Sequence, residues 1–286
     1  MLFDEVITTY LDARRHEIRS HARSLYGYKR LYPHFAGRKI TDIRRADVRD
    51  YIESRRVDGV KPATINRELD LLSAAINHAR FEFELDIPNP VHKMSLKEPE
   101  GRVRWISRDE STRLIEASRL HARTPHLACF IQLALHTGCR KSELLTLEWK
   151  TVELNHGFFV LDPKNTKSAK RRTIPINDLA KHVLLEIREW NSENCPGTPW
   201  VFSTRQNRRI TTFQNGFEAA CKRAGIDDFR IHDLRHTCAS WLVMQGVPLL
   251  AVKELLGHYS IEMTERYAHL APDHVKNAVQ LLLTFE

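Results

Sequence analysis

A stretch without hydrophobic periodicity, residues 88–102, separates two helix-like halves of this 286-residue chain. It holds three prolines and a glycine among mixed charges, a composition that is typical of linkers. A chain of this length is too long for one ordinary compact domain and suits two. The sequence therefore predicts one domain over residues 1–95, a linker at 96–102 and a second domain over 103–286.

The first domain is predicted to be helical. Its apolar residues recur at a spacing of three to four positions. The clearest segment opens with Pro62, and a stripe of its apolar side chains runs from Ile65 to Ala79. Three similar segments precede it, so the pattern indicates a small bundle of about four helices.

The second domain is predicted to be mostly helical with one small sheet. Ser107 and Glu110 have the three-residue spacing of a capping box, which marks the start of a helix. The runs at 157–163 and 171–176 look like strands, and a basic segment at 164–170 joins them. These features predict a hairpin with a basic tip. The fold class is therefore mainly α with a small β-sheet.

Basic residues gather in both domains. The net charge is +8 and the pI is about 9.3, a balance that favours polyanionic partners. Ten Lys or Arg and only two acids lie between Arg14 and Arg45, and a second cluster without acids runs from Lys164 to Arg172. Either cluster alone could be a solvated face. Together they favour a clamp around a charged rod, with one cluster on each domain.

The chain lacks the sequence marks of membrane and secreted proteins. No stretch approaches the roughly 18 apolar residues of a membrane helix. The N-terminal segment carries Asp4 and Glu5 and no short apolar block, so it does not resemble a signal peptide. The five cysteines are widely spread without a C-x-x-C pair, which favours free thiols. The sequence predicts a cytoplasmic protein.

Six polar residues stand at junctions between the predicted elements of the second domain. His232 and Arg235 are three residues apart at the start of one helix, so they face the same way. Tyr267 is expected on a helix that Ser260 can cap. Taken singly, each of the six has an ordinary structural interpretation, such as a core tyrosine or a surface arginine. The six are Arg140, Lys167, His232, Arg235, His258 and Tyr267.

Four segments of the second domain resemble the boxes of the tyrosine recombinase (phage integrase) family. They occur in the family's order with near-identical spacing, and the resemblance covers the whole domain. In the first domain, PATINRELDLLSAAINHA is similar to the family's helical core-binding domain. The resemblance implies a SAM-like core-binding domain followed by an α+β tyrosine-recombinase catalytic domain. The four segments are TGCRKSELLTLEW, NTKSAKRRTIPI, IHDLRHTCASWLVMQGVPL and VKELLGHYSIEMTERYAHL.

This resemblance implies a site-specific DNA recombinase in which Tyr267 attacks a phosphodiester and forms a 3′-phosphotyrosine. Arg140 and Arg235 would clamp the non-bridging oxygens, because Arg stays charged and presents a planar fork to phosphate. Lys167 would protonate the leaving 5′-oxygen, since it stands five residues before Arg172, where the family's lysine stands. Integration, excision, inversion and resolution would all use these residues.

The resemblance assigns supporting roles to other side chains. A tyrosine phenol has a reference pKa of about 10, so it needs help with its proton, and His232 is expected to act as general base or proton acceptor. His258 would donate a hydrogen bond to a non-bridging oxygen, and Glu143 resembles the family's supporting acidic residue. His236 and His269 are expected to be structural hydrogen-bonding residues.

No cofactor is expected. The covalent link conserves bond energy, so rejoining needs no ATP, and the chain has no P-loop. The family is independent of metal, and His232-x3-His236 lacks the Glu of the zinc motif H-E-x-x-H. The implied partner is double-stranded DNA at a specific recombination site, with no small-molecule substrate and no membrane. The protein is expected to be a monomer when free and a homotetramer on DNA.

The segment after Tyr267 is predicted to carry the assembly contact. Asp273 can start a helix with one apolar stripe, formed by Val275, Val279, Leu282 and Leu283. The resemblance suggests that this helix packs into a neighbouring protomer. The alternative is that the stripe covers its own domain.

Two other functions remain open. A type IB topoisomerase shares this chemistry but relaxes supercoils without assembling on a specific site. The small helical first domain and the segment after Tyr267 favour a recombinase over that enzyme. A DNA-binding regulator that has lost catalysis is expected to lack at least one of the six residues, and this chain keeps them all.

Overall fold

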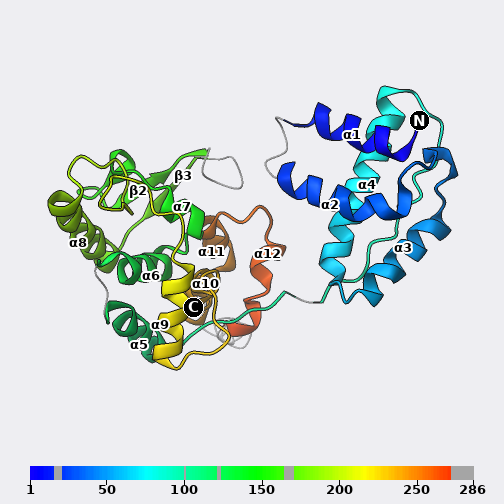
Figure 1. Cartoon of the computed structure of the whole chain (residues 1–286). Helices are drawn as coiled ribbons and strands as arrows, with labels where there is room; N and C mark the ends of the chain where they lie inside the picture. Colours follow the sequence, from blue (N-terminus) through cyan, green and yellow to red (C-terminus); the bar gives the residue numbers. More distant parts are fainter. Residues whose placement is uncertain (16–20, 100, 121–123, 164–170, 272–286) are drawn as a thin grey trace, which may run out of the picture. The chain divides into compact units, whose positions relative to one another are not determined.

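The computed structural model divides into two compact units, Met1–Gly101 and Arg102–Glu286. Figure 1 shows the helices and strands of both units. Helices predominate, and the strands that are seen form one small sheet, which confirms the predicted fold class. The described residues are 1–15, 21–99, 101–120, 124–163 and 171–271.

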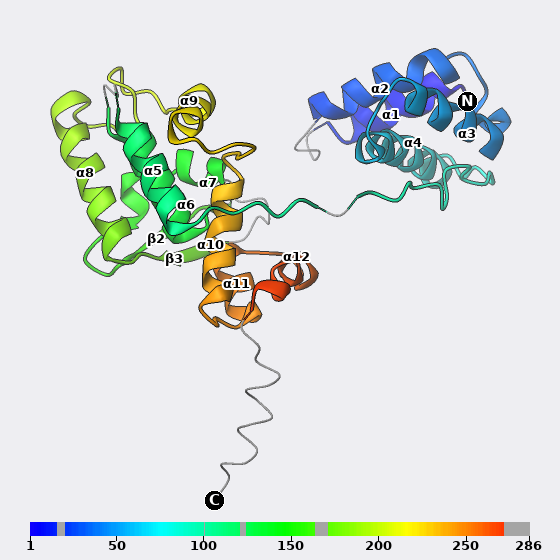
Figure 2. The same cartoon turned by 90° about the horizontal axis from the view of Figure 1, so that it is seen from below.

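In its described part, the first unit is a bundle of four α-helices with one 3-10 turn. Pro62 occupies the first turn of α4, where its missing N–H costs no hydrogen bond. Helices α1 and α2 both pack against α4 (Figure 2), and their apolar faces bury one core. The elements are α1 (Phe3–Ala13), α2 (His21–Phe35), η1 (Ile40–Asp42), α3 (Arg45–Val57) and α4 (Pro62–Glu82).

A buried ion pair links α3 and α4 inside this bundle. Arg55 donates from Nε and Nη2 to the two carboxylate oxygens of Glu68, at 3.1 and 2.9 Å. Tyr51 donates its hydroxyl to Glu68 at 2.7 Å, and Arg55 reaches Asp58 with Nη1 at 2.9 Å. Each charge is matched by an opposite charge and by hydrogen bonds, as burial of ions requires.

The second unit is built around α6, an apolar helix that packs against α5, α8 and α10. The capping box predicted at the start of α5 is present: the Glu110 N–H donates to Ser107 at 3.1 Å, and the Ser107 N–H donates to Glu110 at 2.8 Å. The helices are α5 (Arg108–Arg119), α6 (His126–Thr137), α7 (Lys141–Leu145), α8 (Asp178–Asn194), α9 (Gln214–Ala224), α10 (Asp233–Met244), α11 (Leu249–Leu256) and α12 (Glu262–Glu265).

One antiparallel sheet of three strands, in the order β1-β2-β3, lies in this unit. Phe159 of β2 pairs with Ile174 of β3, and both side chains are buried in the main core. The sequence predicted β2 and β3 but not β1, because two residues are too few to show an alternating pattern. The strands are β1 (Val152–Glu153), β2 (Phe158–Leu161) and β3 (Arg172–Pro175).

The segment around Tyr267 departs from the single helix that the sequence predicted. It forms the short α12 and then a 3-10 turn, η4 (Ala268–Leu270). Ile261 is the N-cap of α12, so Ser260 does not cap it, and Tyr267 lies between the two pieces. The Tyr267 N–H donates to the Thr264 carbonyl three residues earlier. Three residues per turn place Thr264 and Tyr267 on the same buried side.

Two predicted features lie outside the described residues. One is the basic hairpin tip at 164–170, which includes Lys167, and the other is the helix predicted to start at Asp273. Within the described residues, none of the helices has the length and apolar character that crossing a membrane requires.

Candidate active site

Two glycine turns bring the predicted site residues toward one place in the second unit. Helix α6 ends at Gly138 and α11 ends at Gly257, both in the left-handed region with φ of 62° and 64°. Arg140 and His258 follow these turns. The positive φ favours glycine at position 257, and a side chain there would also displace the Arg172 guanidinium from its place.

Glu143 is the only carboxylate seen among the arginines of this site in the described part of the chain. Its side chain is fully buried, and it accepts the Arg140 backbone N–H and the Arg140 Nη1, both at 2.8 Å. Arg172 donates to it from Nη2 at 2.9 Å and also reaches the Leu256 carbonyl with Nη1. One negative charge therefore holds two guanidiniums in fixed positions.

Arg235 adds a third positive charge, and no carboxylate pairs with it in the described part of the chain. Its side chain is only 3% exposed, and Nη1 donates to the Gly138 carbonyl at 2.8 Å. Its Nη2 is buried and has no hydrogen-bond partner among the described residues. Burial and then the charge of Arg140 lower the pKa of Arg235 to about 10, so it stays charged at neutral pH. A buried donor of this kind is costly unless an anion occupies the site.

Two predicted histidines lie in the field of these arginines. Burial, then the charges of Arg235 and Arg140, lowers the pKa of His232, the N-cap of α10. The same causes lower the pKa of His258 to about 3, and its Nδ1 lies 2.8 Å from Oγ1 of Thr264. Both rings are therefore neutral near pH 7. Within the described residues, no group of three His, Cys, Asp or Glu side chains could hold a metal ion.

Tyr267 is buried and contacts a histidine that the sequence placed among structural residues. It is 1% exposed and joins a small apolar cluster with residues of α10 and α11. Its Oη lies 2.5 Å from Nδ1 of His236. Burial raises the pKa of Tyr267 to about 12, against the lowering effect of Arg235.

Five of the six predicted site residues thus lie in the described part of the second unit, and Lys167 does not. Arg140 donates to the Gly257 carbonyl, and Arg235 donates to the Gly138 carbonyl. The charges of both arginines lower the pKa values of His232 and His258, and the charge of Arg235 also acts on Tyr267. Two further contacts were missed from the sequence. Arg172 served only to locate Lys167, and no local pattern showed that it would reach Glu143. Nor did any pattern show that His236 would meet Tyr267.

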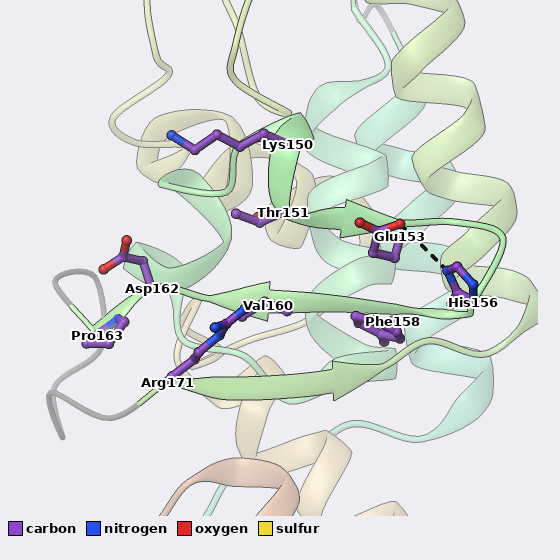
Figure 3. Close-up of a pocket in the computed structure, with 9 residues that line it drawn as sticks. All are labelled: Lys150, Thr151, Glu153, His156, Phe158, Val160, Asp162, Pro163 and Arg171. Atoms are coloured by element: carbon purple, nitrogen blue, oxygen red, sulfur yellow. Dashed lines mark ion pairs between the residues drawn. The ribbon is translucent and has the colours of Figure 1, made fainter.

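A separate hollow lies on the sheet, as Figure 3 shows. Its volume is about 690 Å³, and none of the five described site residues lines it. Its charges are partly paired, since His156 meets Glu153 at 3.7 Å and Lys150 meets Glu148 at 2.7 Å. The described residues that line this hollow carry charges of both signs, Lys150 and Arg171 against Glu153 and Asp162, unlike those of the arginine site.

Comparison with known proteins identifies the family. The model of the phage integrase family matches residues 104–274. The integrase of Salmonella phage P22 is 32% identical over 281 residues, which cover 85% of this chain and 70% of that protein. The chain spans 64% and 65% of the length of the integrases from Escherichia phage 186 and Haemophilus phage HP1. This chain belongs to the phage integrase family, the tyrosine-type site-specific recombinases.

Solved structures share the fold. The Tn1549 transposon integrase in complex with a circular intermediate DNA matches with a TM-score of 0.77 and 18% identity, over 97% of this chain and 99% of that chain. Lambda integrase, solved as a dimer bound to a COC′ core site, matches with a TM-score of 0.76 and 19% identity, over 94% and 95%. A lambda integrase tetramer bound to a Holliday junction also matches, with a TM-score of 0.71 and 19% identity, over 91% and 78%.

Proposed function

We propose that this protein cuts and rejoins double-stranded DNA at a specific site through a 3′-phosphotyrosine at Tyr267. The observation that carries the proposal is the excess of buried positive charge around Glu143. Arg140 and Arg172 share this carboxylate, and the buried Arg235 has no carboxylate partner among the described residues. A DNA phosphodiester supplies the missing negative charge, and its transition state carries more of it.

In the proposed reaction, one phosphorus–oxygen bond replaces another. The Tyr267 Oη forms a bond to phosphorus while the bond from phosphorus to the 5′-oxygen breaks. The phenolic proton passes to His232 as base, and the 5′-oxygen takes a proton from Lys167. Rejoining reverses the step with the 5′-hydroxyl as nucleophile, so no ATP is consumed.

Four further groups stabilise the transition state in this proposal. Arg140 and Arg235 donate to the two non-bridging oxygens, and His258 adds a third hydrogen bond. Glu143 orients Arg140 through its backbone N–H and its guanidinium. Because these donors are fixed before the phosphate arrives, little reorganisation is needed when the charge develops.

We assign the DNA grip to both parts of the chain. Residues 1–95 would be the core-binding domain, 96–102 the linker and 103–286 the catalytic domain, with basic clusters in both domains holding phosphates. Four protomers would assemble on DNA from free monomers, and the segment after Tyr267 would pack into a neighbour. The tetramer reported for lambda integrase on a Holliday junction supports this assembly.

The test starts with the nucleophile. DNA joined to the protein through phosphotyrosine is recovered from cells and sequenced, which yields the recombination site. A duplex of that sequence with a nick beside the cleavage point then traps the adduct. Tyr267→Phe removes one oxygen and should abolish the adduct while DNA binding persists. Tyr259→Phe is the matched control, because Tyr259 is 91% exposed and near His258 in sequence, and it should keep activity.

The other outcomes would indicate a different nucleophile or a different class of protein. An adduct formed by Tyr267→Phe would show that another side chain is the nucleophile. Relaxation of supercoiled DNA without a preferred site would indicate a type IB topoisomerase. Site-specific binding by the unaltered chain with no adduct would indicate a DNA-binding regulator. Products of two-site plasmids separate integration, excision, inversion and resolution.

A further inference from the structure

The hydroxyl of Tyr267 is held by His236 of α10. Oη lies 2.5 Å from Nδ1, and the two rings are 5.8 Å apart with a tilt of 49°. No other hydrogen bond to this hydroxyl is found among the described residues. A proton on Nδ1 would leave the phenolic hydrogen without an acceptor in that part of the chain, so the phenol donates to Nδ1.

The rest of the Tyr267 side chain is enclosed. Tyr267 belongs to the apolar cluster that also holds Val243 of α10 and Val252 and Leu256 of α11, and it is 1% exposed. A nucleophile has to come within about 3–3.5 Å of the atom that it attacks. A DNA phosphate has no access to the hydroxyl in this position, so Tyr267 has to turn outward before it can react.

The protonation states of Tyr267 and His236 agree with a position in which the phenol is held but not activated. Burial raises the pKa of Tyr267 to about 12. Burial, followed by the charges of His232 and Arg266, lowers the pKa of His236 to about 4. At neutral pH the proton therefore stays on the phenol, while His236 stays neutral and keeps the lone pair that accepts it. The contact holds the phenol without activating it.

We propose that His236 is a positioning residue for the nucleophile: its Nδ1 holds the Tyr267 hydroxyl in a buried, closed position, and DNA cleavage requires this hydrogen bond to break. His236 adjoins Arg235 on α10, so the residue that holds the hydroxyl and the proposed phosphate-binding residue belong to one helix. This inference rests on the proposed role of Tyr267. It adds that Tyr267 has a closed state and that His236 holds the hydroxyl in it.

The first test follows the tyrosine itself in the full-length protein. Tyr267 is replaced by 3-fluorotyrosine, and a soluble paramagnetic agent reports the exposure of the label by fluorine NMR. Without DNA the label should be protected, and a duplex of the mapped site should expose it. His236→Phe keeps a ring of similar size without the acceptor and should expose the label before DNA is added. His236→Gln retains an acceptor and should keep the label protected.

The second test measures adduct formation in a single turnover on the nicked duplex. The net effect of one hydrogen bond corresponds to about two- to tenfold in an equilibrium. His236→Phe should therefore form the adduct about two- to tenfold faster than the unaltered protein, with unchanged DNA affinity. His236→Gln should stay near the unaltered rate.

Opposite results overturn the inference. A slower adduct with unchanged DNA affinity would mean that His236 activates the nucleophile. A label that stays protected in the DNA complex would mean that no opening occurs, and this measurement uses the natural histidine even if His236→Phe does not fold. The fluorine measurement does not depend on DNA cleavage, so it tests the closed state separately from the proposed function. The proposed function would instead be refuted by an adduct that persists in Tyr267→Phe.

Discussion

Each unit buries an arginine against a glutamate, yet the charges balance in one unit and not in the other. In the first unit Glu68 faces Arg55 with both oxygens and accepts a third hydrogen bond from Tyr51. The remaining Arg55 nitrogen bonds to Asp58. The arginine and the glutamate neutralise each other, and their hydrogen-bonding atoms are paired.

In the second unit three guanidiniums surround the single carboxylate of Glu143. Arg140 and Arg172 use both of its oxygens, and Arg235 is left with a carbonyl and an unpartnered Nη2 within the described residues. The same residue types thus form a closed structural pair in one place and an open anion site in the other. The difference lies in the count of charges, and it predicts opposite responses to mutation.

Breaking the closed pair should have the largest effect on stability. Glu68→Ala leaves Arg55 buried without its counter-charge, and such a loss costs about 3–5 kcal/mol. Hydrogen exchange of peptides from α3 and α4 measures the first unit. All five tryptophans lie between residues 105 and 241, so their fluorescence in a urea titration reports the second unit, which should not change.

The matched control is an exposed pair on α3, the helix that carries Arg55. Glu53 and Arg56 meet at 3.4 Å in solvent, and Glu53→Ala should cost less than about 1 kcal/mol. Equal effects of Glu53→Ala and Glu68→Ala would contradict the view that the buried pair supports the bundle.

Removing a charge from the open site should instead affect catalysis. Arg235→Ala should slow adduct formation by about 10²–10³-fold, because loss of one fixed donor removes about 2.7–4 kcal/mol of transition-state stabilisation. The stability of the second unit should not fall by a similar amount, since the substitution also removes an unpaired buried donor. The exposed Arg230 supplies the control Arg230→Ala, which should cleave normally.

A substrate with sulfur in place of the 5′-bridging oxygen sharpens this result. Sulfur leaves without needing a proton, so it should restore cleavage to Lys167→Ala and do little for Arg235→Ala. Equal rescue of both variants would exclude the proposed division between general acid and phosphate clamp.

Much of the fold could be read from the sequence because its signals are local. The capping box at Ser107 and Glu110 and the proline at the start of α4 act within one helical turn, and both are present. The broken helix before Tyr267 could not be read in this way. Its tight turns accompany the burial of Thr264 and Tyr267 against other helices, and this depends on packing between distant segments.

The same distinction between local signals and long-range contacts applies to the site. The family resemblance singled out Arg140 and Arg235, whose guanidiniums contact the carbonyls of the Gly257 and Gly138 turns. The contacts of Arg172 with Glu143 and of His236 with Tyr267 span 29 and 31 residues. No local periodicity encodes such pairs, so only the structure reveals them.

The second unit also contains a basic group that is buried in its neutral form, which allows a test by pH. Burial lowers the pKa of His126 to about 4, whereas an unfolded histidine has a pKa of about 6.5. The unfolded state therefore binds the proton first, and the stability of this unit should fall as the pH drops from about 6.5 toward 4. At pH 5 the loss from this residue is about 2 kcal/mol.

Tryptophan fluorescence in urea at pH 7 and pH 5 measures this loss. His126→Phe should reduce the difference between the two pH values, while the exposed His156→Phe should leave it unchanged. The rings of His126 and Trp190 are 4.5 Å apart, so the reporter lies beside the titrating group. An unchanged pH dependence in His126→Phe would show that protonation elsewhere destabilises this unit.

The smallest expected effect tests the open site without DNA. Inorganic phosphate should bind at Arg235, where a donor is unpartnered among the described residues, and it should stabilise only the second unit. At ten times the dissociation constant, binding contributes about 1.4 kcal/mol. The tryptophan transition should move to higher urea with phosphate but not with sodium chloride of equal ionic strength, and Arg235→Ala should abolish the shift. The first unit, with its closed pair, should show no matching change in hydrogen exchange. Equal stabilisation of both units would indicate a general salt effect, and the contrast between closed and open charge sites would then fail.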